Sequence, residues 1–213
     1  MKPFLKLFIP FLLFLFSASL NAQNNSVFKK FSQLSRPEKC WAFRHPFAAK
    51  KAWKITKNVL KVTDSIAGVK TLDGDQNGGQ VDAFCHSCWM ASLAQRIGWR
   101  KALKLGRAHE KANYIDYKKH RLEDGVHPDK ASGDMDIYNN KVGAAIGKEN
   151  KNVTGKDLQI LIIDAIKAGK MKILKKDSLG NFLDEKNNII PDDSMKGKWD
   201  NGKCIVNSNL KNP

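Results

Sequence analysis

The chain has 213 residues, enough for one domain with a well-buried core and a little short for two. Its 37 Lys and Arg residues outnumber its 21 Asp and Glu residues, so the formal net charge is +16. Such a basic chain favours an anionic partner, such as a lipid headgroup, a wall polymer or nucleic acid, although the charge also serves solubility. The lysines are not interleaved with aromatic residues as in a binder of RNA or single strands.

Residues 1–22 have the three-part order of a secretory signal peptide. Lys2 and Lys6 precede an apolar run over residues 7–16, and small residues then lead to Ala22. This run is shorter than the ~20 residues of a membrane-spanning helix, which argues against an uncleaved anchor. We therefore expect cleavage after Ala22 and export to the periplasm or the exterior.

The first part of the remaining chain predicts a lead-in, a helix and a loop. Residues 23–40 are polar and are expected to be mobile. After Pro46, apolar residues recur at three- and four-residue spacing, which predicts an amphipathic helix that ends before Gly68. The Asp- and Gly-rich residues 73–79 predict a loop. Its pattern has some likeness to a calcium loop, but Phe84 stands where an EF-hand needs glutamate, so an ordinary turn is favoured.

Four further helices are predicted by apolar periodicity and by their terminal residues. They cover residues 80–97, 99–117, 133–148 and 154–168. A short hairpin is expected to join residues 170–175 to residues 181–190.

The predicted fold class is therefore all-α, a bundle of about five helices with a small C-terminal β-hairpin. We expect the helical domain with its hairpin to occupy residues 41–195 and to be followed by a tail over 196–213. After signal cleavage, no remaining segment is long and apolar enough to be an integral membrane span.

Four cysteines, Cys40, Cys85, Cys88 and Cys204, lie in a chain expected to reach an oxidising compartment. Disulfides are plausible there, and the favoured pairing is Cys85 with Cys88 and Cys40 with Cys204. The Cys-x-x-Cys spacing also resembles a redox or zinc pair. However, the chain has no second Cys-x-x-Cys and no strand-turn context typical of a thioredoxin fold.

Polar side chains share the helical phase of the apolar residues on three predicted helices. These residues are Asp82 and His86 on one helix, His109 and Glu110 on the next, and Asp136, Asn139 and Asn140 on a third. Facing helices of a bundle can bring such groups together into a metal or catalytic site.

Three ordered motifs carry a resemblance to a known family. They read Asn77-Gly-Gly-Gln-Val-Asp82-Ala-Phe-x-His86-x-x-Trp89, then His109-Glu110, then Met135-Asp136-x-x-Asn139-Asn140-x-x-Gly143. Over about residues 41–175 the chain resembles a bacterial family of unknown function with these motifs. The resemblance implies a helical fold and no established activity. The family usually has arginine where this chain has Cys85, so a role of that arginine in binding an anion or in pairing with the aspartate is absent here.

Two interpretations of the polar cluster remain open. In the functional one, His86, His109 and Asp136 bind a divalent metal, and Asp82 orients His86 through its second ring nitrogen. Glu110 is a further possible ligand, and Glu110 and Asp82 are the catalytic candidates for the hydrolysis of an ester, phosphodiester or peptide bond.

In the structural interpretation, the same side chains form a satisfied buried network that fixes the helices, with Asn139 and Asn140 bonded to the backbone. The protein is then a non-catalytic interaction domain of the envelope or of the secreted fraction. His45 precedes a proline at a helix start and either caps that helix or approaches the cluster. A serine hydrolase is disfavoured because the chain has no Gly-x-Ser-x-Gly.

Overall fold

The computed structural model describes residues 34–122 and 126–210. The expected signal peptide, residues 1–22, lies outside the described residues. The described chain is mainly helical and carries one small antiparallel sheet, which confirms the expected class. The described residues form seven helices, slightly more than the number of about five that was expected.

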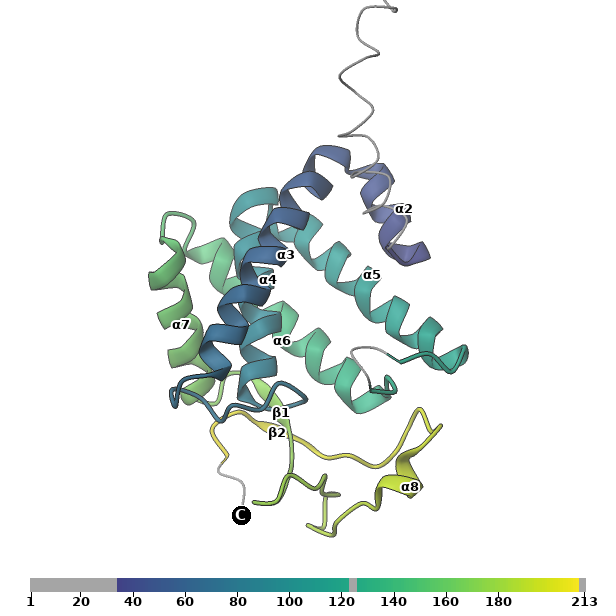
Figure 1. Ribbon diagram of the computed structural model, residues 1–213. Coiled ribbons are helices and arrows are strands. Elements are labelled where there is room, and N and C mark those ends of the chain that lie inside the picture. Colours follow the sequence, from purple (N-terminus) through teal and green to yellow (C-terminus); the bar gives the residue numbers. More distant parts are fainter. Residues whose placement is uncertain (1–33, 123–125, 211–213) are drawn as a thin grey trace, which may run out of the picture.

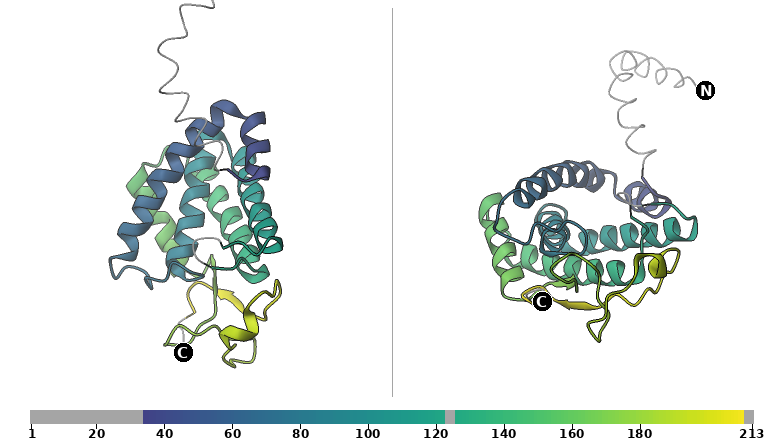
Figure 2. Two further views of the ribbon diagram at one scale, coloured as in Figure 1. Left: turned by 45° about the vertical axis from the view of Figure 1, so that its right-hand side comes forward. Right: turned by 60° about the horizontal axis from the view of Figure 1, so that its bottom comes forward.

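The helices form a bundle around α4 (Gln80–Ile97). This helix contacts α3 (Pro46–Ala67), α5 (Trp99–Lys118), α6 (Lys130–Glu149) and α7 (Gly155–Lys167). Figure 1 and the two views of Figure 2 show α4 enclosed by these neighbours. Phe84, Met90 and Leu93 of α4 are fully buried. The helix therefore supplies the centre of the apolar core.

Two glycines of α6 let it pack closely against α4. A Cβ atom built on Gly143 would overlap the backbone of Ser87, and one on Gly147 would overlap the backbone of Ala91. Because only glycine fits at these two positions, the backbones of α4 and α6 approach each other more closely than larger residues would allow. Polar side chains on the two helices are thereby brought within reach of each other.

A short helix, α2 (Arg36–Arg44), precedes the bundle and overlaps the segment expected to be a mobile lead-in, residues 23–40. Ser35 and Glu38 form a capping box: the Glu38 backbone N–H donates to the Ser35 hydroxyl, and the Ser35 backbone N–H donates to the Glu38 carboxylate. This reciprocal pair satisfies two N–H groups at the start of the helix. The expectation of a lead-in therefore fails over the helical part of that segment.

The C-terminal part closes one end of the bundle, at the bottom of Figure 1. Strand β1 (Lys172–Leu174) pairs antiparallel with β2 (Ile205–Asn207), and the short α8 (Asp192–Met195) lies between them in the chain. The expected hairpin is present only in part: Lys176 bridges antiparallel to Phe182, whereas the strand partner of β1 is β2, which lies in the segment expected to be a tail. Residues 181–190 contribute two isolated bridges, Lys176 to Phe182 and Leu183 to Ile189.

No disulfide joins any of the four cysteines, all of which lie in the described residues. Cys40 is on α2 and Cys204 directly precedes β2, and these elements lie at opposite ends of the molecule in Figure 1. A disulfide needs Cα atoms within about 7 Å, so the expected pairing of Cys40 with Cys204 does not fit this fold. No disulfide joins Cys85 to Cys88 either, and burial raises the pKa of the Cys88 thiol to about 12.

Within the described ranges, none of the helices combines the length and the apolar character that crossing a membrane requires.

Candidate functional site

Asp82, His86 and Asp136 meet between α4 and α6. Asp82 and His86 lie one turn apart on α4, and the close packing of α6 places Asp136 opposite them. His86 Nε2 is 3.5 Å from Asp82 Oδ1 and 3.4 Å from Asp136 Oδ1. The expectation that Asp82 orients His86 through its second ring nitrogen is wrong, because both carboxylates face the same nitrogen.

The spacing of these three side chains fits a divalent cation. One donor atom from each residue lies within 4.8 Å of the others. Ligand bonds of about 2.0–2.2 Å hold neighbouring donor atoms roughly 3–3.6 Å apart, which covers both distances from His86 Nε2. The two distances are long for hydrogen bonds. We call these three residues the acidic triad.

His86 has no second anchor for its ring. Its Nδ1 atom is buried and has no hydrogen-bond partner in the described part of the chain. In most metal sites the second nitrogen of a ligating histidine donates to a carboxylate or a carbonyl group. The His86 ring is therefore held by packing and by its two carboxylate neighbours.

Asp82 is tied to the loop that precedes α4. Its Oδ2 atom accepts a hydrogen bond of 2.7 Å from the Gly78 backbone N–H. Burial raises the pKa of the Asp82 carboxyl, nearby Asp75 raises it further, and His86, Gly78 and Lys176 lower it. The net upward direction means that the protein environment does not by itself favour the charged form of this carboxyl.

Residues 73–79 form a loop, as predicted. Asp73 accepts backbone N–H groups from Asp75 and Gln80, and Asp75 accepts one from Asn77. The Lys176 ammonium lies at the centre of this turn, bonded to the Asp75 carboxylate and to the Asn77 carbonyl oxygen. A lysine thus supplies the positive charge that this acidic loop binds.

Glu110 lies on α5 as a buried carboxyl beside the triad. Its oxygens accept hydrogen bonds from the side-chain amides of Asn113 at 3.3 Å and Asn140 at 3.4 Å. Burial raises the pKa of the Glu110 carboxyl, while His86, His109 and Asn113 lower it and Asp82 raises it. A buried carboxyl whose pKa is raised by burial is a candidate for proton transfer beside a binding site.

His109 does not join the triad, although it was expected as a metal ligand. Its Nδ1 atom lies 3.3 Å from Glu38 Oε1, and its ring packs edge-on against Trp89 at a centroid distance of 5.7 Å. The His109 and His86 rings are neighbours, with centroids 6.4 Å apart. His109 therefore lies beside the triad and belongs to a pair with Glu38.

Glu38 is the site residue that the sequence interpretation did not include. Burial raises its pKa, but hydrogen bonds from His109 and Ser35 lower the pKa of this carboxyl to about 2. Glu38 is therefore ionised at neutral pH and orients His109. The sequence carried a signal for it, since Ser35-x-x-Glu38 has the spacing of a capping box.

Asn139 and His45 have structural roles. The Asn139 side chain donates to the Lys172 carbonyl at 2.9 Å and accepts from the Lys172 backbone N–H at 2.8 Å, which ties α6 to β1. His45 ends α2, precedes α3 without capping it by a side-chain hydrogen bond, and packs on Trp41. Asn140 belongs to the site through Glu110, and its Oδ1 atom is buried without a hydrogen-bond partner among the described residues.

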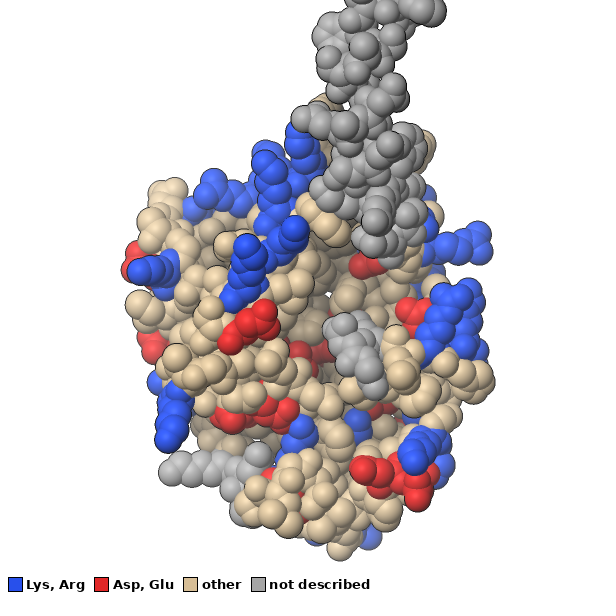
Figure 3. Space-filling model, viewed as in Figure 1, with Lys and Arg blue, Asp and Glu red and all other residues tan. Residues whose placement is uncertain are grey.

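The triad is recessed and not sealed. The side chains of Asp82, His86 and Asp136 are 19, 16 and 10% exposed, and the His109 side chain is 30% exposed. Figure 3 shows acidic atoms at the bottom of a hollow near the centre of this face. Water and a small cation therefore have access to this region from solvent.

The fold and the cluster define a mainly helical domain with carboxylate and imidazole groups gathered between its helices. The chain belongs to the family described as Domain of unknown function (DUF6973), whose match covers residues 39–170. This confirms membership of a domain-of-unknown-function family. The matched range contains the triad, His109 and Glu110, and Glu38 directly precedes it. No curated protein and no solved structure matches the chain.

Proposed function

We propose that this protein is a divalent-metal-dependent hydrolase. The observation that carries the proposal is the acidic triad, with the imidazole nitrogen of His86 at 3.5 and 3.4 Å from the carboxylates of Asp82 and Asp136. One nitrogen and two oxygen ligands suit Zn²⁺ or Mn²⁺, and three protein ligands leave a position for water or substrate.

A cation held by Asp82, His86 and Asp136 would supply Lewis-acid chemistry: it would polarise the carbonyl oxygen of an ester or peptide, or a phosphoryl oxygen of a phosphodiester, and would lower the pKa of water. Its positive charge also favours the ionised form of Asp82, whose pKa is raised without it. Asp82 therefore acts as a ligand and not as the base that the sequence suggested.

Glu110 and His109 are the two groups that would transfer protons. Glu110 is buried beside the triad and is the candidate general base, held in place by the amides of Asn113 and Asn140. His109, more exposed and oriented by ionised Glu38, is placed to exchange protons with a leaving group.

The surplus of Lys and Arg supports an anionic substrate, because a basic surface concentrates anions near the protein. The N-terminal signal-like segment supports action outside the cytoplasm. The anionic substrate and the location outside the cytoplasm are therefore part of the proposed function.

The first test measures metal binding by the protein without a histidine tag. Zn²⁺ and Mn²⁺ are titrated by calorimetry into the wild type and into His86→Ala, Asp136→Asn and the matched control His127→Ala, whose imidazole is exposed far from α4 in the chain. We expect one bound ion per chain and a loss of at least tenfold in affinity for the two triad variants but not for the control. Equal binding by all four proteins would reject the site.

The second test separates binding from catalysis. Hydrolysis of bis-p-nitrophenyl phosphate and of p-nitrophenyl acetate is followed with the metal-loaded wild type and with Glu110→Gln. We expect Glu110→Gln to keep metal affinity and to lose about 10²-fold in rate, as when a general base is removed. Binding without turnover of either probe in the wild type would contradict the hydrolase assignment and leave the metal site standing.

One observation favours the alternative of a non-catalytic interaction domain. Asn139 is fully committed to the Lys172 backbone, and Glu110 is bonded to two amides, as in a network that fixes the register of helices. Under this alternative His86→Ala lowers the melting temperature and the protein binds no metal.

A further inference from the structure

The corner between α2 and α3 exposes two large aromatic side chains. Phe43 is 83% exposed and Phe47 is 88% exposed, on either side of the turn made by His45 and Pro46. The opposite side of the same two helices is buried through Trp41, Ala42 and neighbouring alanines. The phenylalanines therefore point away from the core and are not needed to complete it.

The same stretch of chain is purely cationic. Residues 39–63 contain seven Lys and Arg residues and not one Asp or Glu. They are Lys39, Arg44, Lys50, Lys51, Lys54, Lys57 and Lys61. Six of them are exposed, and Figure 3 shows Lys and Arg side chains standing together over the upper part of the molecule, where α3 begins. This charge adds to the general basic character and is concentrated on α2 and α3.

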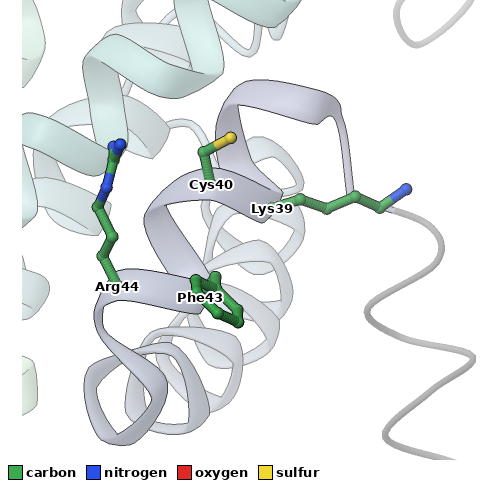
Figure 4. Close-up of a pocket in the computed structure, with 4 residues that line it drawn as sticks. All are labelled: Lys39, Cys40, Phe43 and Arg44. Atoms are coloured by element: carbon green, nitrogen blue, oxygen red, sulfur yellow. The ribbon is translucent and has the colours of Figure 1, made fainter.

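A shallow depression of about 270 Å³ opens on α2 within this corner. It is lined by Lys39, Cys40, Phe43 and Arg44. Figure 4 shows the side chains of Lys39 and Arg44 reaching to either side of Phe43. Cationic groups therefore flank an aromatic tip, which is the layered order of a surface that meets lipid headgroups and the top of the acyl chains.

We propose that the α2–α3 corner, residues 39–54, docks the protein on an anionic lipid bilayer. Phe43 and Phe47 enter the interface, and the Lys and Arg side chains around them contact lipid phosphates. The docking is peripheral, since the described helices include no membrane span. Two fully apolar side chains that project from one corner among cations match the apolar interior and anionic surface of a bilayer, which favours lipid over nucleic acid as the occupant. The proposal does not depend on the metal site.

The experiment places a fluorescent probe in the α2–α3 corner. Its signal therefore reports insertion of this corner, and lipid binding by an apolar N-terminal segment does not produce it. Cys40 is exposed and is labelled with an environment-sensitive NBD fluorophore in the full chain carrying Cys85→Ala and Cys204→Ser. Cys88 is buried and its pKa is about 12, so it does not compete for the label. Vesicles contain phosphatidylcholine alone or an equal mixture with phosphatidylglycerol.

We expect a blue shift of the fluorophore on mixed vesicles and quenching by brominated acyl chains. The variant Phe43→Ser/Phe47→Ser loses both signals, whereas the matched control Leu179→Ser, which alters a side chain 86% exposed elsewhere, keeps them. Lys50→Gln/Lys51→Gln/Lys54→Gln weakens the response at least tenfold. The control Lys156→Gln/Lys167→Gln/Lys170→Gln, with three exposed lysines on and after α7, weakens it by less than twofold.

Three outcomes overturn the proposal. The first is an equal signal on neutral and anionic vesicles, and the second is a double serine variant that inserts like the wild type. The third is tighter binding to duplex DNA than to mixed vesicles, measured by anisotropy of the same label. Circular dichroism of each variant confirms that the helices are intact, so a lost signal reports docking and not unfolding.

Discussion

At the scale of single residues, Glu38 does two things with one carboxylate. Its Oε2 atom closes the capping box at the start of α2, and its Oε1 atom pairs with His109 on α5. A helix cap and a site residue are usually different side chains. Here the start of α2 and the orientation of His109 depend on the same group, so the ionisation of Glu38 couples stability to the site.

We predict that Glu38→Gln removes an acid-sensitive part of the stability. The folded protein holds the pKa of Glu38 at about 2, below its ordinary value of 4.5, so this residue stabilises the fold above pH 4.5 and loses that effect as the pH falls toward 2. Glutamine keeps the capping box but carries no charge. The variant should be less stable by roughly 1 kcal/mol at pH 7, since the group is partly screened by solvent.

Urea unfolding at pH 7 and at pH 2.5 checks this prediction. The difference in the free energy of unfolding between the wild type and Glu38→Gln should be smaller at the lower pH. Glu149→Gln, an exposed change on α6, should show no gap at either pH. A gap that persists unchanged at pH 2.5 would show that the Glu38 charge is not its source.

The sequence allowed part of the site to be predicted. Asp82 and His86 share a face of one helix because they are four residues apart, and Asp136 has the same phase among the buried positions of α6. The pairing of His109 with Glu38 could not be predicted in this way. The two residues are 71 positions apart, and their contact depends on how α2 packs on α5.

At the scale of elements, the site depends on how closely α4 and α6 approach. Gly143 and Gly147 face the α4 backbone at Ser87 and Ala91, and Asp136 lies two turns before Gly143 on the same helix. A small separation of the helices therefore moves one triad carboxylate away from His86. The close contact between α4 and α6 therefore determines both the packing of the core and the geometry of the proposed cation site.

We predict that Gly143→Ala destabilises the protein by about 2–4 kcal/mol, because its methyl group overlaps backbone atoms that cannot rotate away. The same change should weaken metal binding at the triad although it alters no ligand. Thermal unfolding and metal titration test both effects. The matched control is Gly155→Ala on α7, where a Cβ atom meets nothing within 4 Å, and it should be neutral in both assays. Equal behaviour of the two variants would refute the close-packing argument.

The sequence predicted well those elements whose pattern lies within the element itself. Five helices have apolar periodicity and glycine or proline boundaries, and their observed limits lie within a few residues of the expected ones. The partner of β1 was mispredicted, because β2 follows it by about thirty residues and three-residue strands have too little pattern to define a pairing. The predicted disulfides failed for a related reason, since cysteine spacing does not reveal which residues the fold brings close.

At the scale of the whole molecule, the domain extends beyond the range of the family match. Met171, Ile173, Leu174 and Leu183 lie after residue 170 and are at most 3% exposed. Met171 and Ile173 belong to the apolar cluster that also holds Ile162 and Ile166 of α7. The C-terminal part is therefore a piece of the core and not an appendage.

We predict that a chain ending at Lys170 does not fold to the native state. Burying four such side chains contributes roughly 6–12 kcal/mol, which is comparable to the entire stability of an ordinary domain. Circular dichroism melting should show a cooperative transition for the full chain and a broad one, or one lowered by more than ~10 °C, for the truncated chain. Leu179→Ser, which changes an exposed residue of the same segment, should melt like the wild type. A truncated chain with an unchanged transition would refute this prediction.

Two lysines of the C-terminal part tie distant segments of the chain together. Lys176 reaches Asp75 across 101 positions of the chain, and Lys203 reaches Asp129, the residue that caps α6, across 74 positions. Such distant partners form late, because the intervening chain must first be ordered. A chain still being synthesised lacks the ammonium groups that close the turn before α4 and neutralise the α6 cap. The turn before α4 and the start of α6 are therefore held in place by side chains that only the C-terminal part supplies.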